Sequence, residues 1–124
     1  MQLNLEHPDH EFVLRAADGA SARVNDRQLH ASFVLSPNRL VDDWGVQDVK
    51  AMTPQDLEPV LALDPEVILL GSGAAQKFPP AAVIAACLSR GVGLETMTNA
   101  AAARTFNILA GEGRRVVAAF VLAG

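Results

Sequence analysis

A glycine loop is the first place where the sequence offers residues suited to chemistry. Gly71, Ser72 and Gly73 follow an apolar run at residues 67–70 and precede a predicted helix. This order of strand, glycine loop and helix can hold a phosphate, because free backbone N–H groups and the helix dipole converge on the anion. Glu95 lies near the end of the next predicted strand, where a dinucleotide-binding domain keeps an acid for the ribose.

The residues that follow the loop argue against a nucleotide site. The third glycine position of the dinucleotide fingerprint holds Gln76, and Pro79 and Pro80 remove two backbone donors at the start of the helix. No Gly-Lys-Ser/Thr sequence follows, which excludes a P-loop. We therefore expect no cofactor-binding residue here and interpret the loop as a tight turn or a site for a small anion.

A cleft at the ends of parallel strands is a second interpretation of the same residues. Ligands of open α/β sheets collect beyond the carboxyl ends of the strands. If the two strands are neighbours, Gly71, Ser72 and Gly73 together with Thr98 and Asn99 would line a shallow polar cleft. The alternative is structural, with Thr98 as a helix cap and Ser72 bonded to a loop amide. Both interpretations stay open.

Four further polar residues lie in or after the predicted C-terminal helix. Thr105 and Asn107 are poor helix formers in an alanine-rich segment, and we expect Asn107 to bond a neighbouring loop. Glu112 and Arg115 flank the turn into the last strand, and we expect them to pair across it. A structural role is favoured for all four, and they are also candidates for a ligand or partner site.

The sequence provides no set of residues for catalysis or metal binding. All three histidines precede position 31, so no Ser/His/Asp arrangement can be assembled. His7 and His10 lie among acids without a distant residue to complete a metal site, and we expect residues 1–11 to form a flexible terminus. Cys87 falls on an apolar stripe and behaves as a small hydrophobe.

The elements that must position these residues divide the chain in two. Strands are predicted over residues 12–17, 20–24 and 28–35, with turns at 18–19 and 25–26, and a further short strand over 39–44. Thr53 begins a short helix that Pro59 is expected to kink or split. Strands at 67–70, 92–97 and 115–122 then alternate with helices at 80–89 and 99–110.

Two details of the helices can be predicted as well. The helix at 80–89 should bury a stripe of Val83, Ile84, Cys87 and Leu88, and Gly111 should follow the end of the helix at 99–110. We therefore predict one α/β domain over residues 1–124, an N-terminal β-meander followed by βαβαβ, with helices packed on a mixed sheet.

Composition narrows the class of protein. The chain has 124 residues, a formal charge of −4 and a single cysteine. Without a basic stripe we expect no binding to nucleic acid, and without a long apolar run or a basic leader we expect no membrane insertion and no signal peptide. A lone cysteine fits a reducing compartment, so we expect a cytoplasmic protein.

Three stretches of the sequence resemble a known family. They are FVLSPNRLVDDW at 33–44, EVILLGSG at 66–73 and GVGLETMTNAAAARTFNILAGEGRRVVAAFVL at 91–122. They are similar to the small, mostly uncharacterised DUF498-type family of α/β domains that includes mitochondrial complex I assembly factor 3 and its bacterial and archaeal relatives. The resemblance covers nearly the whole chain after residue 12, and residues 97–119 are its most specific part.

The resemblance implies a compact α/β domain with a mixed sheet and, for the mitochondrial members, a role in building respiratory complex I. It supplies no catalytic set, and because the sequence starts without the pattern of a mitochondrial presequence we expect a bacterial member. The positions that match the family's recurrent residues are Trp44, Gly71, Gly73, Thr98, Thr105, Asn107, Glu112 and Arg115.

Two functions from different classes are consistent with these observations. The first is a non-enzymatic binding or assembly factor that presents a surface to a protein partner, such as a respiratory or membrane-complex subunit. It predicts an exposed apolar patch. The second is a protein or enzyme that binds a small molecule or anion in the strand-end cleft, and it predicts a concave pocket with convergent amides. We favour the first, and homodimer formation is open for both.

Overall fold

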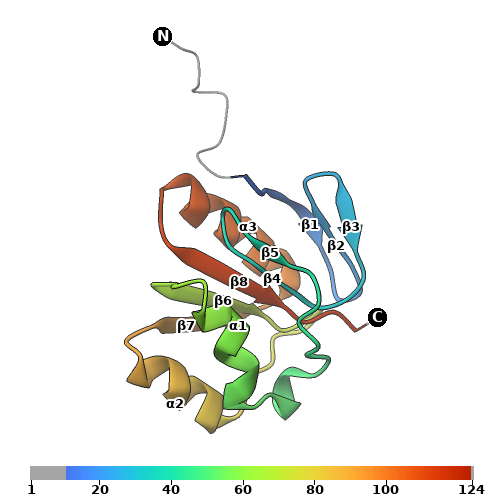
Figure 1. Ribbon diagram of the computed structural model, residues 1–124. Helices are drawn as coiled ribbons and strands as arrows, with labels where there is room; N and C mark the ends of the chain where they lie inside the picture. The colour runs from blue at the N-terminus through green and yellow to red at the C-terminus, as the bar shows by residue number, and fades with distance from the viewer. Residues whose placement is uncertain (1–10, 124) are drawn as a thin grey trace.

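The computed structural model describes residues 11–123. They form two β-sheets and the helices that pack on them (Figure 1). The predicted flexible terminus at 1–11, apart from Glu11, and the histidines at positions 7 and 10 lie outside the described residues. Within the described range, the helices are all too short or too polar to cross a membrane.

The first sheet is the predicted β-meander. Its strands, in the order β1-β2-β3, are β1 (Leu14–Ala17), β2 (Ala22–Val24) and β3 (Arg27–Leu29), all antiparallel. Asp18 closes the first turn, because its Oδ1 accepts hydrogen bonds at 2.8 Å from the amides of Ala20 and Ser21. Asn25 closes the second with a φ of 52°, a left-handed conformation that Asn tolerates.

The second sheet is mixed, as predicted. It has the order β5-β4-β8-β6-β7, with β4 (Phe33–Leu35), β5 (Leu40–Val41), β6 (Val67–Gly71), β7 (Gly93–Met97) and β8 (Val116–Phe120). β6 runs parallel to both β7 and β8, whereas β4 is antiparallel to β5 and β8. The α/β fold with a mixed sheet is thereby confirmed.

The prediction of a single strand over residues 28–35 was wrong. The structure divides it into β3 and β4, which belong to different sheets. Phe33, Val34 and Leu35 are all buried, since β4 lies inside the sheet with both faces covered. Ser32 lies at the break, and its Oγ accepts a hydrogen bond of 2.9 Å from the amide of Leu122.

The helices after residue 53 match the predicted positions closely, whereas the 3₁₀ turn at residues 49–51 was not predicted. The helical elements are the 3₁₀ turns η2 (Val49–Ala51) and η3 (Pro54–Leu57), followed by α1 (Glu58–Leu61), α2 (Ala81–Ser89) and α3 (Asn99–Gly111). Asp56 accepts a 2.8 Å hydrogen bond from the amide of Thr53, and the helix splits beside Pro59 as expected. Gly111 is still helical, so its predicted place after the helix was wrong; Gly113, with a φ of 77°, provides the left-handed turn.

The larger sheet separates two apolar cores. Leu69, Phe106 and Phe120 belong to the core shared with α3 and the meander, whereas Ile68 and Val83 belong to the core beneath α1 and α2. Adjacent residues of β6 therefore point to opposite cores, as the alternation of a strand requires. In Figure 1, α3 and the meander lie on one side of this sheet and α1 and α2 on the other.

Candidate functional site

The glycine loop and the start of α3 meet at the carboxyl ends of the parallel strands. The amide of Ser72 donates to the carbonyl oxygen of Met97 at 2.9 Å, and the amide of Asn99 donates to Gly73 O at 2.9 Å. β6 and β7 are neighbours in parallel register, which brings Gly71 opposite Met97. The five residues predicted for the strand-end cleft thus lie next to one another in space.

Asn99 is the centre of this arrangement. Its side chain is fully buried and makes three hydrogen bonds to main-chain groups of three separate segments. Oδ1 accepts from Gly73 N at 3.1 Å, and Nδ2 donates to Asp18 O at 2.8 Å and to Val121 O at 3.0 Å. A Cβ at Gly71 would overlap the Asn99 Oδ1 atom, so the close approach of this side chain requires glycine there.

The two hydroxyl groups of the predicted cleft have structural partners. Thr98 is the N-cap of α3, where its Oγ1 accepts from the amide of Ala101 at 3.3 Å. Ser72 Oγ lies 2.8 Å from the carbonyl oxygen of Ala75, to which it can donate, and it accepts from Lys77 N at 3.0 Å. Both hydroxyls stabilise local backbone, which matches the structural alternative considered for these residues.

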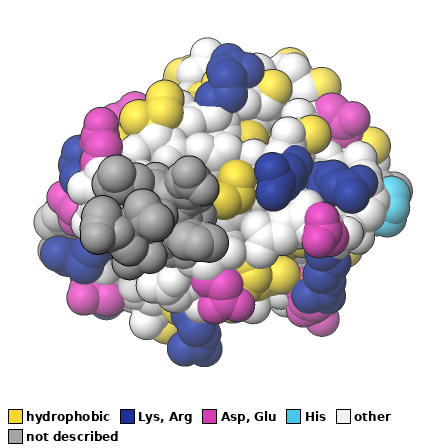
Figure 2. Space-filling view, turned by 90° about the horizontal axis from the view of Figure 1, so that it is seen from above, with side chains coloured by type: hydrophobic (Ala, Val, Ile, Leu, Met, Phe, Trp, Pro, Cys, Tyr) yellow, Lys and Arg dark blue, Asp and Glu magenta, His cyan; other side chains and the backbone are white. Residues whose placement is uncertain are grey.

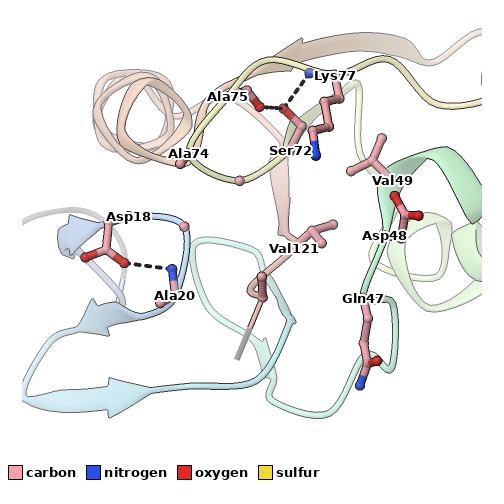
Figure 3. A pocket seen from close by; sticks show the side chains of 13 residues that line it. Asp18, Ala20, Gln47, Asp48, Val49, Ser72, Ala74, Ala75, Lys77 and Val121 are labelled. Atoms are coloured by element: carbon pink, nitrogen blue, oxygen red, sulfur yellow. Dashed lines mark hydrogen bonds between the residues drawn. The ribbon is translucent and has the colours of Figure 1, made fainter.

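A hollow of about 520 Å³ opens at the same end of the sheet, and we call it the carboxyl-end pocket (Figure 3). Four segments line it, namely the β1–β2 turn, the stretch before η2, the loop after β6 and the chain after β8. Their lining residues are Asp18–Ala20, Gln47–Val49, Ser72–Ala75, Lys77, Val121 and Ala123. Gly71, Thr98 and Asn99 are absent from this lining, so the predicted cleft and the pocket share only Ser72 and Gly73.

Charges around the pocket come from two aspartates and one lysine that sequence patterns did not single out. The amides of Ala20 and Ser21 hold the pKa of the Asp18 carboxyl below its usual range. Asp48 caps η2, with Oδ1 accepting from the amide of Lys50 at 3.0 Å. Lys77 is exposed, and its ammonium points into the hollow beside Ser72 (Figure 3).

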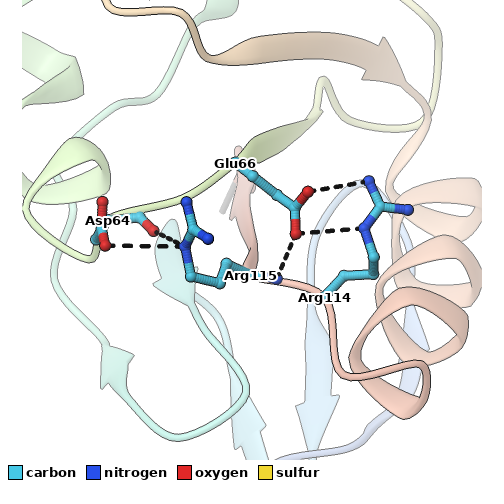
Figure 4. A network of polar contacts seen from close by, with 4 residues as sticks. All are labelled: Asp64, Glu66, Arg114 and Arg115. Atoms are coloured by element: carbon cyan, nitrogen blue, oxygen red, sulfur yellow. Dashed lines mark hydrogen bonds and ion pairs between the residues drawn. The ribbon is translucent and has the colours of Figure 1, made fainter.

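Ionic contacts gather at the opposite end of the sheet (Figure 4). Glu66 accepts from Arg115 N at 3.0 Å and pairs with Arg114, with 3.3 Å between Oε1 and Nε. These contacts lower the pKa of the Glu66 carboxyl, and the hydrogen bond from the Arg115 amide makes the largest contribution. The predicted pair of Glu112 with Arg115 was wrong, because the Arg115 guanidinium turns to Asp64, donating from Nε to Asp64 O at 3.1 Å.

Asn107 connects α3 to the meander. Its Oδ1 accepts from Leu14 N at 2.9 Å and its Nδ2 donates to Leu14 O at 2.7 Å, so the side chain bonds β1 as a neighbouring strand would. We predicted a bond to a loop, and the partner is a strand. Thr105 is half-buried on the same helix. The nine candidate residues therefore occupy both ends of the sheet and the middle of α3, and they do not form one site.

An apolar surface on α2 is the feature that the sequence patterns missed. Phe78 and Leu88 are 63% and 67% exposed. We use the name α2 face for Leu88 and the exposed residues Ala81, Ala82 and Ala85, which share one side of the helix at helical spacing, together with Phe78 in the segment just before the helix. Leu88 was predicted to be buried, and this was wrong, because Val83 and Cys87 are the α2 side chains that meet the sheet.

The α2 face carries no charged side chain and lies beside the edge of the larger sheet. Within residues 11–123, β7 pairs with β6 on one side and with no strand on the other. In Figure 1, α2 lies at the bottom of the view beside β7. Figure 2 shows the molecule from the other end, where acidic and basic side chains are interspersed with apolar ones.

Comparison with known proteins identifies relatives over most of the chain. A family model described as "Protein of unknown function (DUF498/DUF598)" matches residues 14–121. A Xanthomonas campestris protein solved by NMR is 56% identical, with a TM-score of 0.85 over 100% of this chain and 94% of that one. A Bordetella pertussis protein described as a Mth938-like domain is 30% identical, with a TM-score of 0.76 over 100% and 94%.

One curated relative carries a name that refers to a membrane. The "13 kDa major membrane protein" of Francisella tularensis subsp. holarctica is 32% identical over 94 residues, which are 75% of this chain and 76% of the relative. The predicted resemblance to the DUF498-type family is therefore confirmed.

Proposed function

The chain belongs to the family of proteins of unknown function DUF498/DUF598, and from this premise we propose that it is a non-enzymatic protein-binding domain. In this proposal the α2 face docks a subunit of a membrane-bound complex, such as a respiratory complex during its assembly. The observation that carries the proposal is the apolar, uncharged surface of α2.

The energetics of the α2 face favour a protein partner over water. Full burial of an exposed Phe or Leu side chain contributes about 1.5–3 kcal/mol. Phe78 and Leu88 are 63% and 67% exposed, so together they would contribute roughly 2–4 kcal/mol when covered. The three alanines between them leave a low surface on which another helix can pack closely. Central apolar anchors of this kind carry most of the free energy of protein interfaces.

The edge of β7 offers the same partner a second set of contacts. A strand with an open edge presents main-chain N–H and C=O groups that an added strand can bond. Gln76 closes one end of this edge, since its Nε2 donates to Thr96 O at 2.7 Å. Main-chain bonds to Leu94, which faces away from β6, would set the register of a partner that α2 holds by apolar contact.

The class of partner is supported by relatives rather than by the pocket or the polar residues. The resemblance to complex I assembly factor 3 implies a role in building a respiratory complex. The Francisella relative is described as a major membrane protein, which supports a partner located at a membrane. These two observations support the choice of a membrane-complex subunit as the partner in this proposal.

Affinity capture from gently solubilised native membranes tests the proposal. The test variant is Phe78→Gln combined with Leu88→Gln, and the matched control is Ile108→Gln, which removes an apolar side chain that is 60% exposed on α3. We expect subunits of one membrane complex to be recovered with the wild type and the control. With the double variant their recovery should fall at least about tenfold, the equivalent of 1.4 kcal/mol. Equal recovery with the folded double variant, or no membrane subunit with the wild type, would contradict the proposal.

A further inference from the structure

The carboxyl-end pocket lies apart from the α2 face and supports a second activity that does not depend on the proposed function. We propose that this pocket binds a small organic anion, a molecule with an apolar body and one carboxylate, whose charge is held by Lys77 and the amides of the loop after β6. Four observations carry the inference, namely the position of the pocket, its walls, its charges and its unpaired amides.

The pocket has the position and size of a ligand site. β6 leads into α2 on one face of the sheet, and β7 leads through α3 on the other face back to β8, so the connections diverge at the carboxyl end of β6. Crevices where connections diverge in this way are the usual ligand sites of open α/β sheets. Its volume of about 520 Å³ falls within the range of small-molecule sites.

The walls of the pocket are small and mainly apolar. Val49, Val121, Ala74, Ala75 and Ala123 contribute aliphatic surface from three different segments. These side chains have little or no rotamer freedom to lose when a ligand covers them. An apolar body therefore gains burial against a surface that needs no reordering.

Lys77 is the cation available to such a ligand. Within residues 11–123 its ammonium makes no ion pair or hydrogen bond, and it points into the hollow (Figure 3). The two carboxylates of the lining are already engaged, since Asp18 accepts from its own turn and Asp48 caps η2. A carboxylate is thus the group that complements the Lys77 ammonium, the charged group of the lining that makes no hydrogen bond.

Backbone amides beside Lys77 add donors for the same anion. The main-chain N–H groups of the lining residues Ala74 and Ala75 have no acceptor among residues 11–123, whereas those of Ser72 and Lys77 do. Consecutive unpaired amides in a loop are a common cradle for anions. Hydrogen bonds to a charged acceptor contribute more than neutral ones.

The walls are held in place before a ligand arrives. Asn99 bonds the loop through Gly73, the turn through Asp18 and the end of β8 through Val121. Ala123 N donates to Gly19 O at 2.8 Å and fastens the turn to the same strand end. Asn99 is a positioning residue for the pocket, because it orients three walls without lining the hollow itself.

NMR titration of the ¹⁵N-labelled protein tests the inference. The probes are benzoate and octanoate, and benzylamine serves as a control with the same ring and the opposite charge. We expect at least one acid to cause saturable shifts of the Gly73–Lys77 amides, and benzylamine to bind at least about tenfold more weakly. Absence of saturable shifts with both acids, or equal binding of benzylamine, would overturn the inference.

Variants separate the role of Lys77 from nonspecific attraction. Lys77→Gln should weaken binding of the acid by about tenfold, the 1.4 kcal/mol that one charged contact readily contributes. Lys50→Gln removes the other lysine of the chain, which lies on η2 outside the lining, and should change the dissociation constant less than about twofold. Ala75→Trp should fill the hollow and abolish binding while the amide spectrum stays that of a folded protein. Full binding by folded Lys77→Gln or by Ala75→Trp would refute the assignment.

Discussion

Replacing Asn99 by alanine removes three hydrogen bonds from a side chain that is fully buried. Each bond contributes about 1 kcal/mol net, and a buried partner left unsatisfied costs about 1–3 kcal/mol more. Val121 O loses its hydrogen bond in buried surroundings. Asp18 O and Gly73 N lie at part-buried positions, where a water molecule can replace the lost Asn99 side chain as hydrogen-bond partner. The expected loss in the free energy of unfolding is therefore about 3–5 kcal/mol.

Urea unfolding monitored by tryptophan fluorescence measures this loss. Trp44 is the only tryptophan of the chain, and it is buried with its Nε1 donating to Asp56 O at 2.8 Å. With a slope of about 1.5 kcal/mol per molar urea, the expected loss shifts the midpoint by roughly 2–3 M. An unchanged slope shows that the variant still unfolds from a native state of similar compactness.

Two variants on the same helix calibrate the result. Asn107→Ala removes two hydrogen bonds to Leu14 and should cost about 2 kcal/mol. Thr105→Ala removes a half-buried side chain that makes no hydrogen bond within residues 11–123, and its effect should stay within about 0.5 kcal/mol. If Asn99→Ala costs less than about 1 kcal/mol, or no more than Thr105→Ala, Asn99 does not hold the three segments together.

Three further predictions concern single side chains. Gly71→Ala should cost about 2–3 kcal/mol in thermal unfolding, because its Cβ would overlap the Asn99 Oδ1 atom and lie 3.0 Å from the Phe120 ring; an unchanged melting temperature would contradict this. The folded-state pKa of Glu66 is lowered, so its stabilising contribution is present above the unfolded pKa and is lost as pH falls through the folded one. Below about pH 5 the wild type should therefore lose more stability than Glu66→Gln, and parallel pH profiles would refute the role of this carboxylate. Burial raises the pKa of the Cys87 thiol, so iodoacetamide should label it slowly until urea unfolds the protein; rapid labelling of the native protein would show that it is accessible.

Local signals made most of the elements predictable. The apolar run of β6, the Thr98 cap and the Pro54 start are decided by residues close in sequence, and the structure has them where they were predicted. The break between β3 and β4 was missed because alternation continues across it. Which strand joins which sheet is decided by distant partners, here β8 for β4 and β2 for β3.

The candidate site shows the same division between local and distant causes. Turn and cap residues such as Ser72 and Thr98 have recognisable types, so their positions near a strand end were predictable. The pocket was not, because Asp18, Gln47 and Lys77 come from segments far apart in the chain and carry no shared pattern. The exposure of Leu88 was also unpredictable, since spacing alone does not decide which side of an apolar helix meets the sheet.

Site-specific photo-crosslinking in cells tests the docking surface most directly. A photoreactive residue replaces Leu88 on the α2 face, and the same residue at Ile108 on α3 provides the control with similar exposure. We expect a light-dependent adduct with one subunit of a membrane-bound complex from position 88 and none from position 108. No adduct from position 88, or the same products from both positions, would contradict the claim that the α2 face binds a protein partner.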